Sequence, residues 1–163
     1  IMKEAFYIAR TGRPGPVLVD IPLDIQNTEI EFEYPSEISI RGYKPTVNGN
    51  KRQIKKALEK IKNSRKPLIC VGGGVMSAKA EQELIKFIEK SKIPMVHTLM
   101  GKDGIPSKYP YNVGLIGSHG FKYANKAVAD ADVLILVGTR VADRATGGSK
   151  SFGKMADIIH IDR

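Results

Sequence analysis

The sequence lacks several features, and each absence excludes a class of protein. Cys70 is the only cysteine among 163 residues, so no disulfide framework holds the chain together. No apolar run approaches the roughly 20 residues that span a bilayer, and no charged-then-apolar leader opens the chain. These absences predict a reduced, cytoplasmic setting and no membrane partner. Because Cys70 lies in an apolar run without an adjacent basic partner, we expect a buried core residue rather than a catalytic thiol.

Acidic residues are outnumbered by basic ones, which raises the question of a nucleic-acid partner. The formal net charge is +9, and much of the positive charge lies in residues 51–62. Apolar residues recur there at helical spacing, which places the lysines on the opposite, solvated face. The apolar positions are Ile54, Ala57, Leu58 and Ile61. With no zinc-finger spacing and no aromatic-rich single-strand motif, the sequence predicts no nucleic-acid partner.

The order of the local patterns indicates how the chain is organised. Residues 3–9 predict the end of a helix, residues 17–21 predict a short strand, and the polar stretch that follows has no sustained period. Later patterns predict helices at 51–63, 78–91 and 121–129, and strands at 68–71, 95–99, 133–137 and 158–161. We therefore divide the chain into residues 1–26, a linker at 27–50 and a domain at 51–163.

The alternation after residue 50 predicts the fold class. Strand, glycine turn, helix and strand follow one another repeatedly, which is typical of a parallel sheet with right-handed crossovers. Residues 133–137 are apolar at every position, as in a strand that is covered on both faces. The prediction is an α/β, doubly wound parallel sheet of Rossmann-like, FAD/NAD-binding type. Because the chain opens at Ile1 and stops just after a strand, we expect a piece of a longer enzyme.

Candidate binding residues follow the predicted strands, where ligands bind in such sheets. Gly72, Gly73 and Gly74 permit a backbone to approach a phosphate closely. Arg140 and Arg144 are suited to a diphosphate. On spacing alone the alternatives stay open, because a bare glycine triplet also fits a tight turn. The histidines at 97, 119 and 160 also fit packed or capping roles, and Asp143 with Arg144 also fits a surface ion pair.

Taken together, the motifs resemble one family of enzymes. Residues 11–26, 42–45, 71–74, 98–101, 119–120, 124–125, 137–138 and 152–162 resemble, in order and spacing, the large catalytic subunit of the acetolactate synthase (acetohydroxyacid synthase) family. These enzymes use thiamine diphosphate. The resemblance assigns residues 1–26 to the end of the pyrimidine-binding domain and residues from about 40 onward to the central domain.

The resemblance implies that the central domain binds FAD structurally along the strand ends. The residues that it implies for flavin binding are Gly72, Gly73, Gly74, Thr98, Leu99, Gly117, His119, Gly138, Arg140, Asp143, Arg144 and Asp162. Two positions depart from the family pattern. Ala142 stands where the family usually has Asp, and Ser118 stands where it usually has Met.

The implied reaction of the whole enzyme joins two 2-keto acids with loss of carbon dioxide. The thiamine diphosphate and Mg²⁺ sites of the family lie in N- and C-terminal thiamine-binding domains outside this chain, so no catalytic or metal-binding residue is assigned here. The chain alone is expected to be inactive, and the whole enzyme to be a homo-oligomer, with a regulatory subunit as a further partner. Two alternatives remain: the central domain of another thiamine enzyme (a carboligase or an oxidase), and a structural spacer without flavin.

Overall fold

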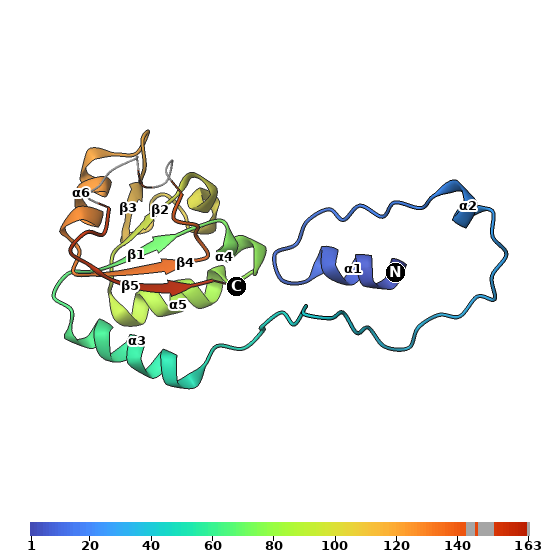
Figure 1. Ribbon diagram of the computed structural model, residues 1–163. Helices are drawn as coiled ribbons and strands as arrows, with labels where there is room; N and C mark the ends of the chain where they lie inside the picture. Colours follow the sequence, from blue (N-terminus) through green and yellow to red (C-terminus); the bar gives the residue numbers. More distant parts are fainter. Residues whose placement is uncertain (143–145, 147–151, 163) are drawn as a thin grey trace. The chain divides into compact units, whose positions relative to one another are not determined.

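The computed structural model describes residues 1–142, 146 and 152–162. These residues form two compact units, Ile1–Gly49 and Asn50–Asp162, which are drawn in Figure 1. The described helices include none that is long and apolar enough to cross a membrane.

The first unit consists of two helices and a long irregular segment. Helix α1 spans Met2–Arg10 and α2 spans Leu23–Gln26, so the helix predicted at residues 3–9 is confirmed. The segment returns to α1, because Lys3 Nζ donates to the Ser36 carbonyl at 2.9 Å and the Tyr43 hydroxyl lies 2.9 Å from Thr11 Oγ1. The strand predicted at residues 17–21 is wrong: no strand forms there, and Leu18 is 88% exposed. An apolar run forms a strand only with a neighbour to complete its hydrogen bonds, and the described part of this unit contains no other strand.

The second unit is built on five parallel strands. They are β1 Pro67–Val71, β2 Met95–His97, β3 Asn112–Leu115, β4 Val133–Val137 and β5 Asp157–Ile161. Their order in the sheet is β3-β2-β1-β4-β5, and every pairing is parallel. The chain therefore builds outward from β1 in one direction and then crosses back to β4 on the other side. This confirms the predicted doubly wound α/β fold.

Helical segments connect the strands. They are α3 Lys51–Asn63, α4 Gly74–Ser77, α5 Glu81–Ser91, the 3₁₀ helix η1 Leu99–Gly104 and α6 Lys122–Asp130. The sequence patterns did not predict α4, η1 or β3. The polar Asn112 and the flexible Gly114 are poor strand formers, which hid β3. The predicted strand 95–99 is too long because η1 already begins at Leu99, and α5 begins later than predicted, after Lys79 with its positive φ of 53°.

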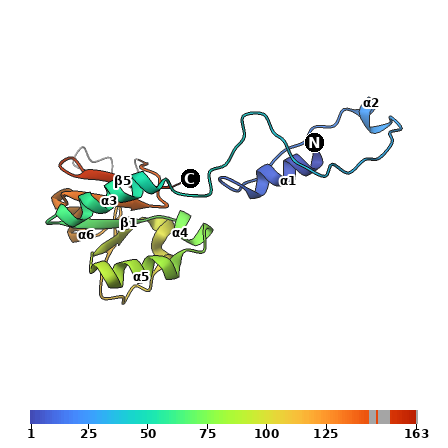
Figure 2. The same ribbon diagram turned by 90° about the horizontal axis from the view of Figure 1, so that it is seen from below.

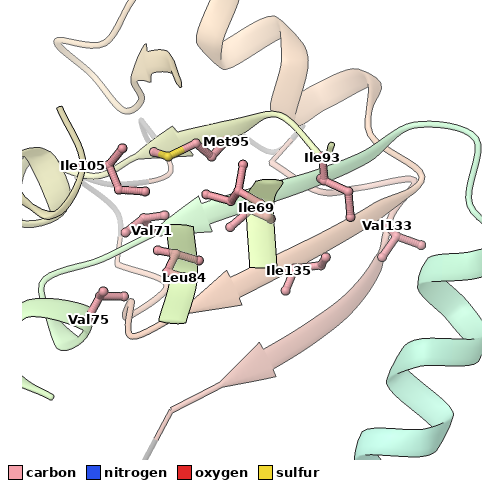
Figure 3. Close-up of a cluster of buried hydrophobic side chains, with 10 residues drawn as sticks. Ile69, Val71, Val75, Leu84, Ile93, Met95, Ile105, Val133 and Ile135 are labelled. Carbon is pink, nitrogen blue, oxygen red and sulfur yellow. The ribbon is translucent and has the colours of Figure 1, made fainter. Parts of the chain in front are cut away.

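Two apolar clusters hold helices to the two faces of the sheet. On one face Ile69, Met95 and Ile135 pack with Leu84 and Ile88, which lie one turn apart on α5; Figure 3 shows this cluster. On the other face the buried side of α6 packs against the sheet, and Figure 2 shows α5 and α6 on opposite sides. The second cluster comprises Leu68, Cys70, Val96, Ile116, Ala124, Val128, Ala131, Leu134 and Leu136.

Cys70 belongs to this second cluster. It is 1% exposed, and burial raises the pKa of its thiol to about 12. The thiol is therefore protonated at neutral pH, which confirms the prediction of a core residue.

Helix α3 begins at a side-chain cap and is only partly covered. Asn50 Oδ1 accepts from the backbone N–H groups of Arg52 and Gln53 at 3.0 and 3.2 Å. Its lysines are exposed, as predicted. Of the predicted apolar stripe, Ile61 packs against the core, but Ile54 and Leu58 stay 50% and 44% exposed.

Candidate functional site

The carboxyl ends of all five strands meet at one edge of the sheet. At each junction, the first residue after a strand donates its backbone N–H to the last carbonyl of the neighbouring strand. The four bonds are Ile116 to His97 at 3.0 Å, Thr98 to Val71 at 2.9 Å, Gly72 to Val137 at 2.9 Å, and Gly138 to Ile161 at 2.8 Å. The structure thereby aligns the starts of five loops, and every described candidate residue lies on one of them.

The glycines after β1 and β4 let these two loops touch where the strand order reverses. The Gly74 N–H donates to the Gly138 carbonyl at 2.8 Å. A Cβ on Gly72 would lie 2.3 Å from the Gly138 oxygen, and Gly138 has a φ of +57° that favours glycine. The N–H groups of Gly72 and Gly74 are thus used inside the protein. Within the described residues, the Gly73 N–H has no acceptor and remains open to a ligand.

The loop after β2 combines a buried start with an apolar, exposed tip. Thr98 is 8% exposed, whereas Leu99 and Met100 are 71% and 74% exposed. His97 is buried, and its Nδ1 donates to the Thr98 carbonyl at 3.1 Å, which uses one ring nitrogen inside the protein. The loop therefore offers an apolar surface beside the Gly72–Gly74 turn.

The loop after β3 is a tight turn fixed from helix α6. The Gly120 N–H donates to the Gly117 carbonyl at 2.9 Å, and Gly117 has a φ of +104°. Asn125 holds Gly117 on both sides: its Oδ1 accepts from the Gly117 N–H at 2.9 Å, and its Nδ2 donates to the Gly117 carbonyl at 3.0 Å. Ser118 and His119 are exposed at the tip, and their N–H groups have no partner among the described residues.

The loops after β4 and β5 are joined through a histidine. His160 Nε2 donates to the Thr139 carbonyl at 2.9 Å and lies 3.6 Å from a carboxylate oxygen of Asp162. Arg140, next in the chain, is exposed. The candidate residues Asp143 and Arg144 lie outside the described residues.

This arrangement suits a long ligand that carries both an apolar ring and anionic groups. Open N–H groups at Gly73, Ser118 and His119, together with the Arg140 guanidinium, are donors for phosphate oxygens. Leu99 and Met100 supply apolar contact. In the described part of the chain, no three His, Cys, Asp or Glu side chains are grouped to hold a metal ion.

Two residues that position the loops were not assigned to the site from the sequence, although residues 124–125 belong to the resembled motif and the histidine at 160 was considered for a packed or capping role. Asn125 and His160 act through hydrogen bonds to the backbone of other segments. Asn125 lies in the first turn of the helix that follows its loop, and the sequence signals for it were its polar side chain there and its place in the motif at residues 124–125.

The strand order, with glycine-rich loops at its reversal, defines a Rossmann-like α/β domain. A family model described as "Thiamine pyrophosphate enzyme, central domain" matches residues 54–163. The chain belongs to this family of central domains.

Similar proteins extend the match over nearly the whole chain. It is 47% identical to a probable acetolactate synthase large subunit of Methanococcus aeolicus, over 99% of this chain and 28% of that protein. It is 43% identical to the acetolactate synthase large subunit of Haemophilus influenzae, with the same coverage. It is 39% identical to the acetolactate synthase isozyme 3 large subunit of Escherichia coli, over 99% of this chain and 29% of that protein. The resemblance found in the sequence is thereby confirmed, and the chain spans less than a third of the length of these relatives.

Proposed function

We propose that this chain is the central, FAD-binding part of an acetolactate synthase. The observation that carries the proposal is the match along 99% of the chain to proteins named acetolactate synthase large subunit, at up to 47% identity. The whole enzyme would condense pyruvate with a second pyruvate or with 2-ketobutyrate, with loss of carbon dioxide, as a step of branched-chain amino acid biosynthesis. It would act in the cytoplasm.

The carboxyl edge of the sheet fits FAD. A flavin dinucleotide presents a flat apolar ring system, a diphosphate and several hydroxyls. Leu99 offers apolar surface, and the open amides near Gly73 and His119 with Arg140 offer donors for the diphosphate. The Asp162 carboxylate is an acceptor for hydroxyl groups. Gly72, Gly74 and Gly138 let two of these loops meet backbone to backbone, which brings their donor groups together.

In this proposal the flavin has a structural role and supplies no chemical step to the condensation. The contribution of this chain is to bind the flavin and to connect two thiamine-binding domains. Residues 1–26 would form the C-terminal end of the first of these domains. Thiamine diphosphate and Mg²⁺ would bind outside the chain, so the 163 residues alone would form no acetolactate. A homo-oligomer, with a regulatory subunit, is proposed for the whole enzyme.

One observation favours a second candidate function, a spacer domain that has lost its flavin. Ala142 and Ser118 stand where the resembled family has an acidic residue and a methionine. If the loops around them no longer hold FAD, the domain would still support the two thiamine-binding domains. A third candidate, the central domain of another carboligase or oxidase, differs in substrate rather than in this site.

The deciding experiment uses the full-length polypeptide that carries this chain, stripped of cofactors and supplied with thiamine diphosphate, Mg²⁺ and pyruvate. We expect acetolactate to form only when FAD is added. Formation without FAD would make the domain a spacer, and no acetolactate under either condition would contradict the synthase assignment.

A flavin titration tests the site itself. Arg140 is exposed, so Arg140→Ala should fold normally and raise the Kd for FAD by about tenfold, the effect of losing one charge-assisted hydrogen bond. Lys126→Ala, on the exposed side of α6, is the matched loss of one positive charge and should leave the Kd unchanged. Equal Kd values for the two variants would show that Arg140 does not contribute to FAD binding.

A further inference from the structure

We propose that Asn125 is a positioning residue for the flavin site, which acts by holding the turn at Gly117–Gly120 in its binding conformation. The inference rests on the proposed function, because it concerns the same flavin. It adds a residue that touches no ligand and that lies on a helix rather than on a strand-end loop.

The geometry of the contact is a two-point clamp. Both polar atoms of the Asn125 side chain bind the backbone of one residue: Oδ1 accepts from the Gly117 N–H and Nδ2 donates to the Gly117 carbonyl, at 2.9 and 3.0 Å. Only an amide side chain presents an acceptor and a donor side by side. Two bonds to one residue fix its orientation as well as its distance.

The clamped residue determines the shape of the whole turn. The same Gly117 carbonyl also accepts from the Gly120 N–H at 2.9 Å, and the Phe121 N–H returns to the Leu115 carbonyl at 2.9 Å. Gly117 has a φ of +104°, a conformation that few residues adopt and that a glycine in a free loop would leave readily. The clamp therefore removes conformational freedom from the segment that carries Ser118 and His119.

The fixed turn presents two backbone donors to the carboxyl edge of the sheet. The N–H groups of Ser118 and His119 have no partner within the described residues, and both residues are exposed. A ligand that binds there avoids the entropy cost of ordering the turn only if the turn is already ordered. Loss of Asn125 would thus weaken binding although the residue itself does not contact the flavin.

The test compares three variants of the full-length polypeptide: Asn125→Ala, Asn125→Asp and Lys126→Ala. Asn125→Asp is isosteric and keeps the acceptor for the Gly117 N–H, but it places a second oxygen against the Gly117 carbonyl. Lys126→Ala is the control, since Lys126 pairs with Asp130 one turn along the exposed face of α6 at 3.0 Å. Each variant is titrated with FAD well below its melting temperature, and the visible circular dichroism of the bound flavin is recorded.

We expect both Asn125 variants to raise the Kd for FAD by about tenfold, which corresponds to about 1.4 kcal/mol, and to change the flavin dichroism. Hydrogen exchange at the Gly120 amide should quicken in the apo protein. Lys126→Ala should match the wild type in all three measurements. Wild-type Kd and dichroism in a folded Asn125→Asp protein, with or without a lower melting temperature, would overturn the inference and leave the proposed function intact.

The failure of the proposed function gives a different result. If the wild-type polypeptide binds no FAD at all, the flavin assignment and the positioning role that rests on it both fall. Hydrogen exchange at Gly120 would in that case still report whether Asn125 holds the turn.

Discussion

The loops at the two ends of the sheet are joined with different emphasis. At the carboxyl end, glycines let loops meet backbone to backbone, as where Gly74 meets Gly138, and the side chains of Asn125 and His160 add neutral hydrogen bonds. At the amino end, backbone bonds are supplemented by charged side chains. The Asp132 carboxylate accepts from the Ser64 hydroxyl and from the backbone N–H groups of Arg65 and Lys66, the latter two at 2.7 and 3.0 Å. Lys60 of α3 forms an ion pair with Asp157 at the start of β5.

The difference separates two ways of joining the loops of one sheet. A carboxylate that caps a loop holds the loop backbone through its own lone pairs. A glycine contact joins two backbones directly, and some N–H groups, such as that of Gly73, have no acceptor among the described residues. We therefore expect substitutions at the carboxyl end to act through steric overlap and substitutions at the amino end to act through charge.

The largest effect is expected from Gly72→Ala. The new Cβ would lie 2.3 Å from the Gly138 carbonyl oxygen and 2.5 Å from the Thr139 Cα, both backbone atoms that cannot turn away. The loops after β1 and β4 must then separate, at a cost of about 3 kcal/mol or more in the free energy of unfolding. Urea denaturation of the chain measures this cost.

The adjacent Gly73→Ala is the matched control. Its nearest neighbours, the Met100 Cβ and the Met100 carbonyl oxygen, both lie at 3.1 Å, a tight contact that a shift of a few tenths of an ångström relieves, and Met100 is exposed. We expect a loss below about 1 kcal/mol. Similar losses for the two variants would show that the close approach at Gly72 is not what joins the loops.

A smaller, pH-dependent effect is expected from Asp132→Asn at the amino end. Hydrogen bonds from the Ser64 hydroxyl, then from Arg65 and Lys66, lower the pKa of the Asp132 carboxyl below its usual range. A carboxyl whose pKa is lowered by folding stabilises the protein above the unfolded pKa of about 3.9, and that contribution disappears as the pH falls through the lower, folded pKa. The wild type should exceed the variant in urea midpoint at pH 7, and the gap should narrow at pH 3.

A gap between the two midpoints that stays constant from pH 7 to pH 3 would contradict this assignment. It would indicate that Asp132→Asn lowers the stability because the amide does not fit the hydrogen bonds of the loop, and not because the negative charge is lost. Asp130→Asn is a suitable control, because Asp130 forms an exposed ion pair with Lys126 and binds no loop backbone.

The sequence predicted the ends of the strands better than the contacts between the loops that follow them. Strand patterns such as residues 133–137 placed most strand ends correctly, and glycines marked the loops that follow. The sequence did not reveal the role of Gly72 and Gly74, because spacing alone does not show that their N–H groups donate to the carbonyls of Val137 and Gly138. The turn at Gly117–Gly120 was recognised only through resemblance, since β3, which carries it, contains Asn112 and Gly114 and lacks the usual strand composition.

Contacts between distant segments explain the remaining differences. Asn125 and His160 act on backbone groups of other loops, and no local pattern reveals such partners. The apolar run at residues 17–21 has strand composition but forms no strand, because strand formation depends on a neighbour and not on composition alone. Helix α3 was predicted correctly in its bounds, yet burial of its apolar stripe depends on what packs against it.

The smallest effect is expected from Lys60→Ala, which removes the ion pair between α3 and β5. Both side chains are half exposed or more, at 50% for Lys60 and 61% for Asp157, so water and salt screen the attraction. We expect a loss below about 1 kcal/mol that vanishes in 1 M salt. Lys126→Ala, which removes a similarly exposed pair within α6, should cost about as little. A larger loss for Lys60→Ala that persists in high salt would mean that the stem of Lys60 packs α3 against the sheet, and the amino end would then also depend on shape.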